Sequence, residues 1–364
     1  MTDVQNLIAL SLLPSWTWSR AADQLRAGAS AEQTLESLIT AHWRDQSDKI
    51  ATLRSRAVAA MRRAAERGIQ ILPWSDRRYP AALATIVDPP LVLWVRGDVD
   101  ALSRPAVAIV GSRAGSPYAL AVAERLATDL ASRGVVVVSG LARGVDSAAH
   151  RGALESGVTA AVLGSGVDVL YPPEHEPLAR EIEKNGAVVS ELVPGTPPQQ
   201  WFFPLRNRII SGLSRAIVVI EAGERSGSLI TARCALEQGR EVLAVPGNVL
   251  SGRNRGAHGL LRDGAKIVES ADDILEELHL GASAGMAARG GTGTAGAAAD
   301  PLLAHLTPGE PSDLDALAER SGLSPSVCWS SASTTAWESE SVASSGRRSA
   351  LAAWIRAMSR RMPG

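Results

Sequence analysis

Residues 107–113 of this chain are VAIVGSR, an apolar and β-branched run that stops at a glycine, a hydroxyl and a cation. The run predicts a β-strand, and the glycine after it predicts a tight turn. In doubly wound α/β sheets, phosphate groups bind at this turn, close to the backbone and to the next helix. Gly111, Ser112 and Arg113 therefore predict a site for an anionic ligand, such as a nucleotide or a nucleic acid.

The pattern of strand, turn and helix recurs along the chain. Six predicted strands end in similar turn residues, at 107–110, 135–139, 160–163, 187–190, 217–220 and 242–245. Amphipathic segments follow most of them, near 119–131, 146–155, 177–184, 207–213 and 228–237. Right-handed crossovers bring the carboxyl ends of such strands to one edge of a parallel sheet. We therefore predict a doubly wound, mostly parallel α/β sheet whose ligand lies along that edge.

Overall charge does not by itself predict DNA binding. Lys and Arg number 37 against 38 Asp and Glu, so the formal net charge is −1, and any nucleic-acid site must be a local patch. Cys234 and Cys328 lack the spacing of a metal site or a disulfide framework, so we expect no metal and no cofactor. Without a signal-like N-terminus or an apolar run of ~18 residues, the chain predicts a cytoplasmic protein with no membrane contact.

Four segments differ in composition and pattern. Residues 1–70 have apolar positions at helical spacing and predict a small helical domain, whereas residues 71–280 contain a proline-rich entry segment and the predicted sheet. Residues 281–300 hold 14 Gly or Ala, a composition typical of flexible linkers. In residues 301–364 a helical pattern begins and then stops abruptly. Either a disordered basic tail follows, or the reading frame shifts near Ser326.

An ordered set of motifs between Val107 and Leu278 resembles the DprA/Smf family, the DNA-processing proteins of natural transformation. The set comprises GSR at 111–113, SGLARGVD at 139–146, FPLRNRIISG at 203–212 and SGSLITA at 226–232, with YPP at 171–173 and VPG at 245–247. A lone Gly-Ser-Arg would carry little weight. The motifs stand in the family's order over about half of the chain, and this order makes the resemblance specific.

This resemblance implies an extended Rossmann-like domain that binds single-stranded DNA, forms a homodimer and carries out no catalysis. It also implies loading of RecA recombinase onto strands displaced from single-strand-binding protein. In the family the arginine of Gly-Ser-Arg contacts the DNA backbone, which points to Arg113. Pro173 stands where the family has a lysine contact, and residues 14–18 replace a glycine-rich hairpin. Residues 302–323 look like the start of a winged-helix-like domain, which the rest of the chain does not complete.

The candidate DNA-binding residues lie in the loops and helix starts at the predicted ligand edge. They are Gly111, Ser112, Arg113, Gly140, Arg143, Arg206, Asn207, Arg208, Ser226 and Ser228. Arginine offers a charge and a fork of N–H donors to phosphate oxygens, while glycine lets the backbone approach closely. Together these residues predict a strip of donors that follows the backbone of a strand.

Several of these candidates have a structural alternative. Arg143 could instead pair with Asp146 or another carboxylate. Residues 206–208 are predicted to stand at the start of a helix, where free N–H groups attract anions. The alternative is that their side chains hold neighbouring loops in place by hydrogen bonds. Ser228 is alternatively only a helix N-cap. The aromatic residues 201–203 either stack on unpaired bases or belong to the core.

Two other classes of function remain open. Asp168, Glu191 and Glu221 fall at predicted strand ends, and the loop 221–227 loosely resembles that of Rossmann-like enzymes that hydrolyse nucleotide glycosidic bonds. A nucleotide-binding or nucleotide-hydrolysing enzyme is therefore the alternative. A third hypothesis is a scaffold that only docks a recombinase. His150 has no Ser or Cys spaced as a nucleophile, and we interpret it as structural.

Overall fold

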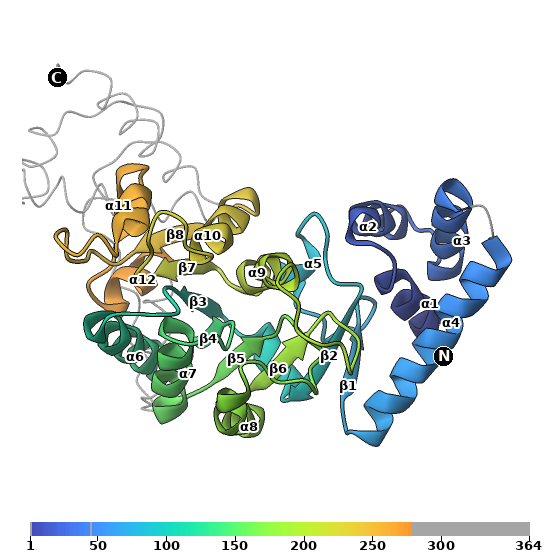
Figure 1. Cartoon of the computed structure of the whole chain (residues 1–364), viewed down its shortest axis with the longest axis horizontal. Coiled ribbons are helices and arrows are strands. Elements are labelled where there is room, and N and C mark those ends of the chain that lie inside the picture. The colour runs from blue at the N-terminus through green and yellow to red at the C-terminus, as the bar shows by residue number, and fades with distance from the viewer. Residues whose placement is uncertain (1, 44–45, 279–364) are drawn as a thin grey trace, which may run out of the picture. The chain divides into compact units, whose positions relative to one another are not determined.

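The computed structural model describes residues 2–43 and 46–278 (Figure 1). Its first part is helical, with α1 (Thr2–Ser11), α2 (Trp18–Arg26), α3 (Ala31–His42) and α4 (Gln46–Glu66). Helix α3 begins at a capping box, in which the Ser30 and Gln33 side chains bond each other's backbone N–H groups. Leucines at helical spacing, such as Leu7 and Leu35, are buried where these helices meet. The periodicity of the sequence is therefore the physical cause of this packing.

The described residues contain one nine-stranded sheet with the strand order β1-β2-β6-β5-β4-β3-β7-β8-β9. The strands are β1 (Gln70–Pro73), β2 (Val92–Gly97), β3 (Ala106–Val110), β4 (Val136–Ser139), β5 (Thr159–Val162), β6 (Ala187–Ser190), β7 (Ala216–Val219), β8 (Glu241–Ala244) and β9 (Lys266–Ile267). Strands β3 to β9 are parallel, while β1 and β2 pair antiparallel at one end. The predicted doubly wound, mostly parallel sheet is confirmed.

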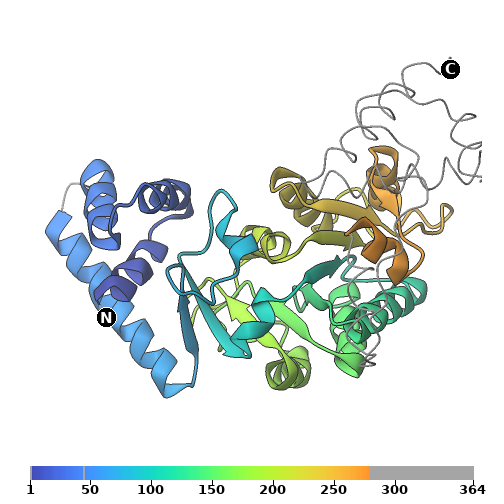
Figure 2. The ribbon, with the colours of Figure 1, turned by 180° about the vertical axis from the view of Figure 1, so that it is seen from behind.

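Helices cover both faces of this sheet, as Figures 1 and 2 show. One face is packed by α5 (Ala81–Ala84), α9 (Phe202–Leu213), α10 (Ser228–Glu237) and α11 (Arg255–Arg262). The other is packed by α6 (Pro117–Ser132), α7 (Val145–Ser156), α8 (Glu176–Asn185) and α12 (Ala271–Glu277). Strands β3 and β7 pair at the centre, and the chain leaves β3 toward β4 on the opposite side. This reversal is the switch point where open α/β sheets bind ligands.

The start of α9 differs from the prediction. The helix begins at Phe202, so residues 206–208 lie in its second turn instead of opening it. Pro204 lies within the first turn, where backbone N–H groups have no hydrogen-bond partner inside the helix. The N–H group that proline lacks therefore costs no hydrogen bond, and the helix can begin before it. Residues 206–208 can therefore offer a ligand their side chains, but not the free N–H groups of a helix start.

The predictions for residues 281–364 lie outside the described residues. They comprise the flexible linker, the winged-helix-like segment and its basic tail, the frame shift near Ser326, and Cys328. Within the part that the structure describes, no helix combines the length and apolar character needed to cross a bilayer.

His150 is fully buried on α7, which agrees with its structural interpretation. Thr159 donates its hydroxyl hydrogen to the carbonyl of Val137 (2.6 Å), so the Nδ1–H of His150 must donate to the Thr159 oxygen (2.7 Å). The Nε2 atom then carries no proton and has no partner within the described structure. Burial, and next the charge of His175, lowers the pKa of His150 to about 3.

Because the imidazole of His150 is buried, we expect the protein to lose stability in acid. The pKa is depressed in the folded state from 6.5 to about 3, so the unfolded chain binds the extra proton as pH falls through that window. The free energy of unfolding should then drop by about 1.4 kcal/mol per pH unit below 6.5 from this residue. Urea unfolding of the parent protein and of His150→Phe at several pH values measures how much His150 contributes to the pH dependence of the free energy of unfolding. Equal slopes for the two proteins would contradict the prediction.

Candidate nucleic-acid interface

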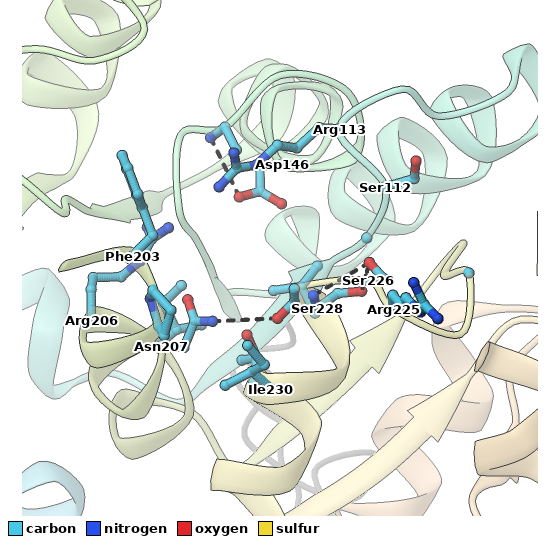
Figure 3. Close-up of a pocket in the computed structure, with 18 of the residues that line it drawn as sticks. Ser112, Arg113, Asp146, Phe203, Arg206, Asn207, Arg225, Ser226, Ser228 and Ile230 are labelled. Atoms are coloured by element: carbon cyan, nitrogen blue, oxygen red, sulfur yellow. Dashed lines mark hydrogen bonds between the residues drawn. The ribbon is translucent and has the colours of Figure 1, made fainter. Parts of the chain in front are cut away.

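A cavity of about 820 Å³ opens at the carboxyl ends of β3, β4 and β7 (Figure 3). We call it the first cavity; it is lined, among others, by Arg113, Phe203, Arg206, Asn207, Arg225 and Ser228. Its walls come from the loops after these strands, from the first half of α9 and from the first turn of α10. The cavity therefore lies at the sheet edge where the sequence predicts the ligand.

Glycines let the loop after β3 pack tightly against the start of α7. A Cβ atom on Gly111 would come within 2.7 Å of the Val145 side chain. Gly144 has a φ of +76°, and a Cβ there would lie 2.3 Å from the carbonyl oxygen of Ser112. Larger residues fit neither the space nor, at Gly144, the backbone conformation. The loop thus carries Ser112 and Arg113 at the rim of the first cavity.

Arg113 is an exposed cation at this rim. Its guanidinium lies over the ring of Phe203, 5.3 Å from the ring centroid. Among the described residues it forms no hydrogen bond and no ion pair. An arginine without a carboxylate partner keeps its N–H donors available, so Arg113 can bind an anion without first breaking an internal contact.

Arg206 lies deeper in the first cavity. Its side chain is buried and donates to the carbonyl oxygen of Val162, while its Nε has no partner in the described part of the chain. Burial lowers the pKa of Arg206 to about 10, and the attraction of Asp146 opposes this shift. Arg206 therefore stays protonated at neutral pH. A Cβ atom on Gly140 would lie 2.2 Å from Nη1 of Arg206, so this glycine makes room for the guanidinium.

The opposite wall of the first cavity consists of amide and hydroxyl groups. The Asn207 amide donates to the carbonyl of Gly227 (3.4 Å), which holds α9 against the start of α10. The hydroxyls of Ser226 and Ser228 lie 2.8 Å apart. The N-cap of α10 is Gly227, so Ser228 is the first residue of the helix and not its cap.

Arg225 also lines the first cavity, although the sequence did not single it out. It is exposed, and no carboxylate pairs with it among the described residues. Its place in the loop that follows β7, directly before Ser226, is the signal that would have found it. Three arginines, Arg113, Arg206 and Arg225, thus line a cavity in which Asp146 is the one carboxylate, so the local charge is positive although the chain is nearly neutral.

Two predicted arginines are held by carboxylates. Arg208 is buried and binds both oxygens of Glu191 (2.6 and 2.7 Å), with Asp88 3.2 Å from its Nε. It does not line the first cavity. Arg143 is exposed and pairs with Glu174, not with Asp146, whose carboxylate accepts the N–H groups of Gly140 and Ala142.

The three aromatic residues at the start of α9 have different environments. Phe202 is buried, Trp201 is 57 % exposed, and Phe203 faces the first cavity. The ring of Tyr171 lies 5.6 Å from that of Phe203, between centroids, at an angle of 43°. One of the three residues therefore offers an aromatic face beside Arg113, where a flat ligand group can stack.

The carboxylates at strand ends already have partners. Asp168 binds Arg63 (2.8 Å) and the Gly195 N–H, and Glu191 binds Arg208. Glu221 accepts hydrogen bonds from the N–H and hydroxyl groups of Ser116. Within the described ranges, no group of three or more His, Cys, Asp or Glu side chains is placed to hold a metal ion. In the first cavity, the arginines can therefore bind phosphate oxygens and Phe203 can stack on a flat ring.

Residues 70–279 match the model of the family described as DNA recombination-mediator protein A. This chain belongs to that family. The resemblance to the DprA/Smf proteins is thereby confirmed. The DNA processing protein DprA of Bacillus subtilis is 39 % identical over 277 residues, which cover 76 % of this chain and 92 % of that protein. Protein Smf of Escherichia coli is 46 % identical over 213 residues, 58 % of this chain and 57 % of its own length.

Solved structures agree with the assignment. DprA from Streptococcus pneumoniae superposes with a TM-score of 0.66 at 36 % identity, covering 74 % of this chain and 95 % of that one. DprA from Helicobacter pylori, whose structure concerns its single-stranded DNA binding mode, superposes with a TM-score of 0.53 at 30 % identity, covering 58 % and 95 % of the two chains. The extended Rossmann-like fold expected for this family fits these neighbours.

Proposed function

We propose that this protein binds single-stranded DNA in the first cavity, without catalysis, and loads RecA recombinase onto the strand during DNA processing in natural transformation. The observation that carries the proposal is Arg113, an unpaired cation beside an aromatic ring at the ligand edge of the sheet. Support also comes from relatives that are named DNA processing proteins and from the H. pylori relative with its single-stranded DNA binding mode.

The lining of the first cavity suits a single strand for two reasons. Arg113, Arg206 and Arg225 offer charge-assisted donors to successive phosphates. Phe203 offers a ring on which an unpaired base can stack, and every base has such a face. In a duplex the bases are stacked on each other, so only the phosphate contacts would remain. Gly111, Ser112, Asn207, Ser226 and Ser228 complete the proposed site with backbone and side-chain donors. Gly140 does not line the first cavity and its N–H donates to Asp146, so its part in the proposed site is to leave room for Arg206.

The structure changes the part that we propose for two arginines. Arg208 holds Glu191 in the interior, and we assign it a structural role. Arg143 would first have to leave Glu174, so we place it at the edge of the DNA path and not at its centre. A hydrolytic role is less well supported, because Asp168, Glu191 and Glu221 already hold Arg63, Arg208 and Ser116.

The partners that we propose are those of a recombination mediator in the cytoplasm. They are RecA recombinase, a second copy of this chain in a homodimer, and single-strand-binding protein. Membership of a family described as a DNA recombination mediator supports them.

A titration followed by fluorescence anisotropy tests the proposal. Labelled single-stranded and duplex oligonucleotides of the same sequence are titrated with the protein at several salt concentrations. We expect preference for the single strand, and a slope of log K against log salt of about −2 if three arginines neutralise phosphates. Equal affinity for the duplex, or no binding by folded protein, would contradict the proposal.

Gly140→Ala is expected to weaken binding through Arg206. The new methyl group would occupy the position of Nη1, so the guanidinium must leave its contact with Val162 and shift in the cavity. We expect the affinity for single-stranded DNA to fall by about tenfold or less, the value of one well-placed hydrogen bond. Gly259→Ala is the control, because nothing lies within 4 Å of a Cβ atom there. Unchanged affinity in Gly140→Ala would remove Arg206 from the site.

A further inference from the structure

A second cavity, of about 600 Å³, opens at the carboxyl ends of β3, β7 and β8. It is lined by the start of α6, by the residues after β7 and by the loop 246–254 that follows β8. Its principal members are Ser116, Tyr118, Glu221, Pro246, Asn248 and Arg253. None of these residues lines the first cavity, and the function proposed above does not use them.

The loop after β3 forms a ridge between the two cavities. Residues 112–114 line the first cavity, and Ser116 and Tyr118 line the second. Arg253, on the second side, donates from Nη1 to the carbonyl oxygen of Ala114 (3.0 Å), directly next to Arg113. Arg253 is exposed and pairs with no carboxylate among the described residues. A strand whose phosphate lies on Arg113 would therefore meet a second arginine where it crosses the ridge.

The second cavity has apolar surface around the ring of Tyr118. The hydroxyl of Tyr118 donates to the carbonyl of Pro246 (3.1 Å), which anchors the tip of the side chain while 53 % of the residue stays exposed. Pro117 and Ile220 add apolar surface beside it. An aromatic ring held in place with an open face is the surface on which an unpaired base stacks.

Glu221 determines which part of a nucleotide can enter. Its buried carboxylate accepts the N–H of Ser116 (3.2 Å) and the Ser116 hydroxyl (2.6 Å), so it occupies the N-terminal end of α6. At this place dinucleotide-binding folds hold a pyrophosphate, and a carboxylate repels such an anion. A carboxylate accepts about four hydrogen bonds, so capacity remains for the amino group of a base. A base, and not a phosphate, therefore matches the floor of the cavity.

We propose that the second cavity binds a base of the same single strand, next to the nucleotide held at Arg113. The base stacks on Tyr118, its amino group faces Glu221, and the phosphate before it contacts Arg253. This inference rests on the function proposed above and adds a second contact point to it. It extends the path of the strand along the sheet edge, from the loops after β4 and β5 to the loop after β8.

The test compares two probes, a nucleoside 5′-monophosphate as the short strand, which reaches only the site at Arg113, and a dodecanucleotide as the long strand. Tyr118→Leu removes the aromatic face, Tyr118→Phe keeps the face but loses the bond to Pro246, and Arg253→Ala removes the cation. Tyr118→Leu and Arg253→Ala should each lower the affinity for the long strand by about tenfold, a typical loss for one stacked base, and leave the short strand unchanged. Tyr118→Phe should keep most of the affinity. Thermal unfolding of each variant should match that of the parent, since both side chains are exposed.

Arg113→Ala separates the two proposals. If it weakens both strands while Tyr118→Leu and Arg253→Ala change neither, the second cavity does not bind the strand and the first still does. If Tyr118→Leu weakens short and long strands equally, the ring belongs to the first contact and the inference is overturned. If Arg113→Ala also leaves both strands unchanged, the proposed function itself fails. A fluorescent 2-aminopurine base in the long strand should lose emission on binding to the parent protein and keep it with Tyr118→Leu.

Discussion

Replacing Arg113 with alanine is expected to lower the affinity for single-stranded DNA by about tenfold to a hundredfold. The estimate follows from the loss of one or two charge-assisted hydrogen bonds to a phosphate, which contribute about 1.5–3 kcal/mol in total. Since Arg113 has no internal ion pair among the described residues, its loss should leave the melting temperature nearly unchanged. Anisotropy titrations and thermal unfolding of the same preparations measure both quantities.

Two control variants sharpen this experiment. Arg125→Ala removes an arginine of α6 that is 83 % exposed at the side chain and lies outside the first cavity, so it should leave the affinity unchanged. Arg113→Lys keeps the charge but loses the planar fork, and we expect it to recover part of the binding. The salt slope of Arg113→Ala should be less steep by about 0.7. A large fall in melting temperature with unchanged affinity would instead make Arg113 a structural residue.

Replacing Arg208 with alanine is expected to have the largest effect on stability, about 3–5 kcal/mol of the free energy of unfolding. The change leaves the carboxylate of Glu191, whose side chain is 7 % exposed, without its partner in the interior. It also removes the guanidinium that lies 5.4 Å from the centroid of the Trp18 ring, and so loosens α9 from α2. Urea unfolding monitored by circular dichroism measures the loss.

Arg208 and Arg143 form a matched comparison, because both were candidates for DNA binding and both have carboxylate partners. The Arg143–Glu174 pair is exposed and screened by solvent, so Arg143→Ala should leave stability nearly unchanged. The double replacement Arg208→Met with Glu191→Met should recover much of the stability lost in Arg208→Ala, because no buried charge remains unpaired. If folded Arg208→Ala instead lost DNA affinity with little loss of stability, Arg208 would belong to the DNA site.

The features of the fold that the sequence predicts correctly are those with a local signal. The strands and the helices after them follow from apolar periodicity and from turn residues such as Gly111 and Gly140, which act over a few positions. Their order also places the ligand edge, since parallel strands with right-handed crossovers share one edge. Strand β9, with two exposed residues, and the early start of α9 were not predicted, because neither carries a distinct pattern.

In the candidate site, too, the residue types follow from the sequence but their partners do not. Arg206 and Arg208 are two positions apart on one helix and look equivalent in the sequence. In the fold, Arg206 reaches the first cavity beside Gly140, while Arg208 meets Glu191 from the end of β6. Periodicity does not reveal which carboxylate packs against which guanidinium. That depends on contacts between residues far apart along the chain.

The doubly wound sheet, the edge at which a ligand lies and the loop that ends in Arg113 all follow from the sequence, because strand, turn and helix signals are short-range. Which cations stay unpaired, and what shape the surrounding cavities have, depends on contacts between residues that are far apart in the sequence. Arg225 joins the first cavity, and the second arises where Tyr118 from the start of α6, Glu221 from the loop after β7 and Arg253 from the loop after β8 come together. Charge pairing and cavity shape depend on all the residues that lie nearby in space, and it is the fold that brings those residues together.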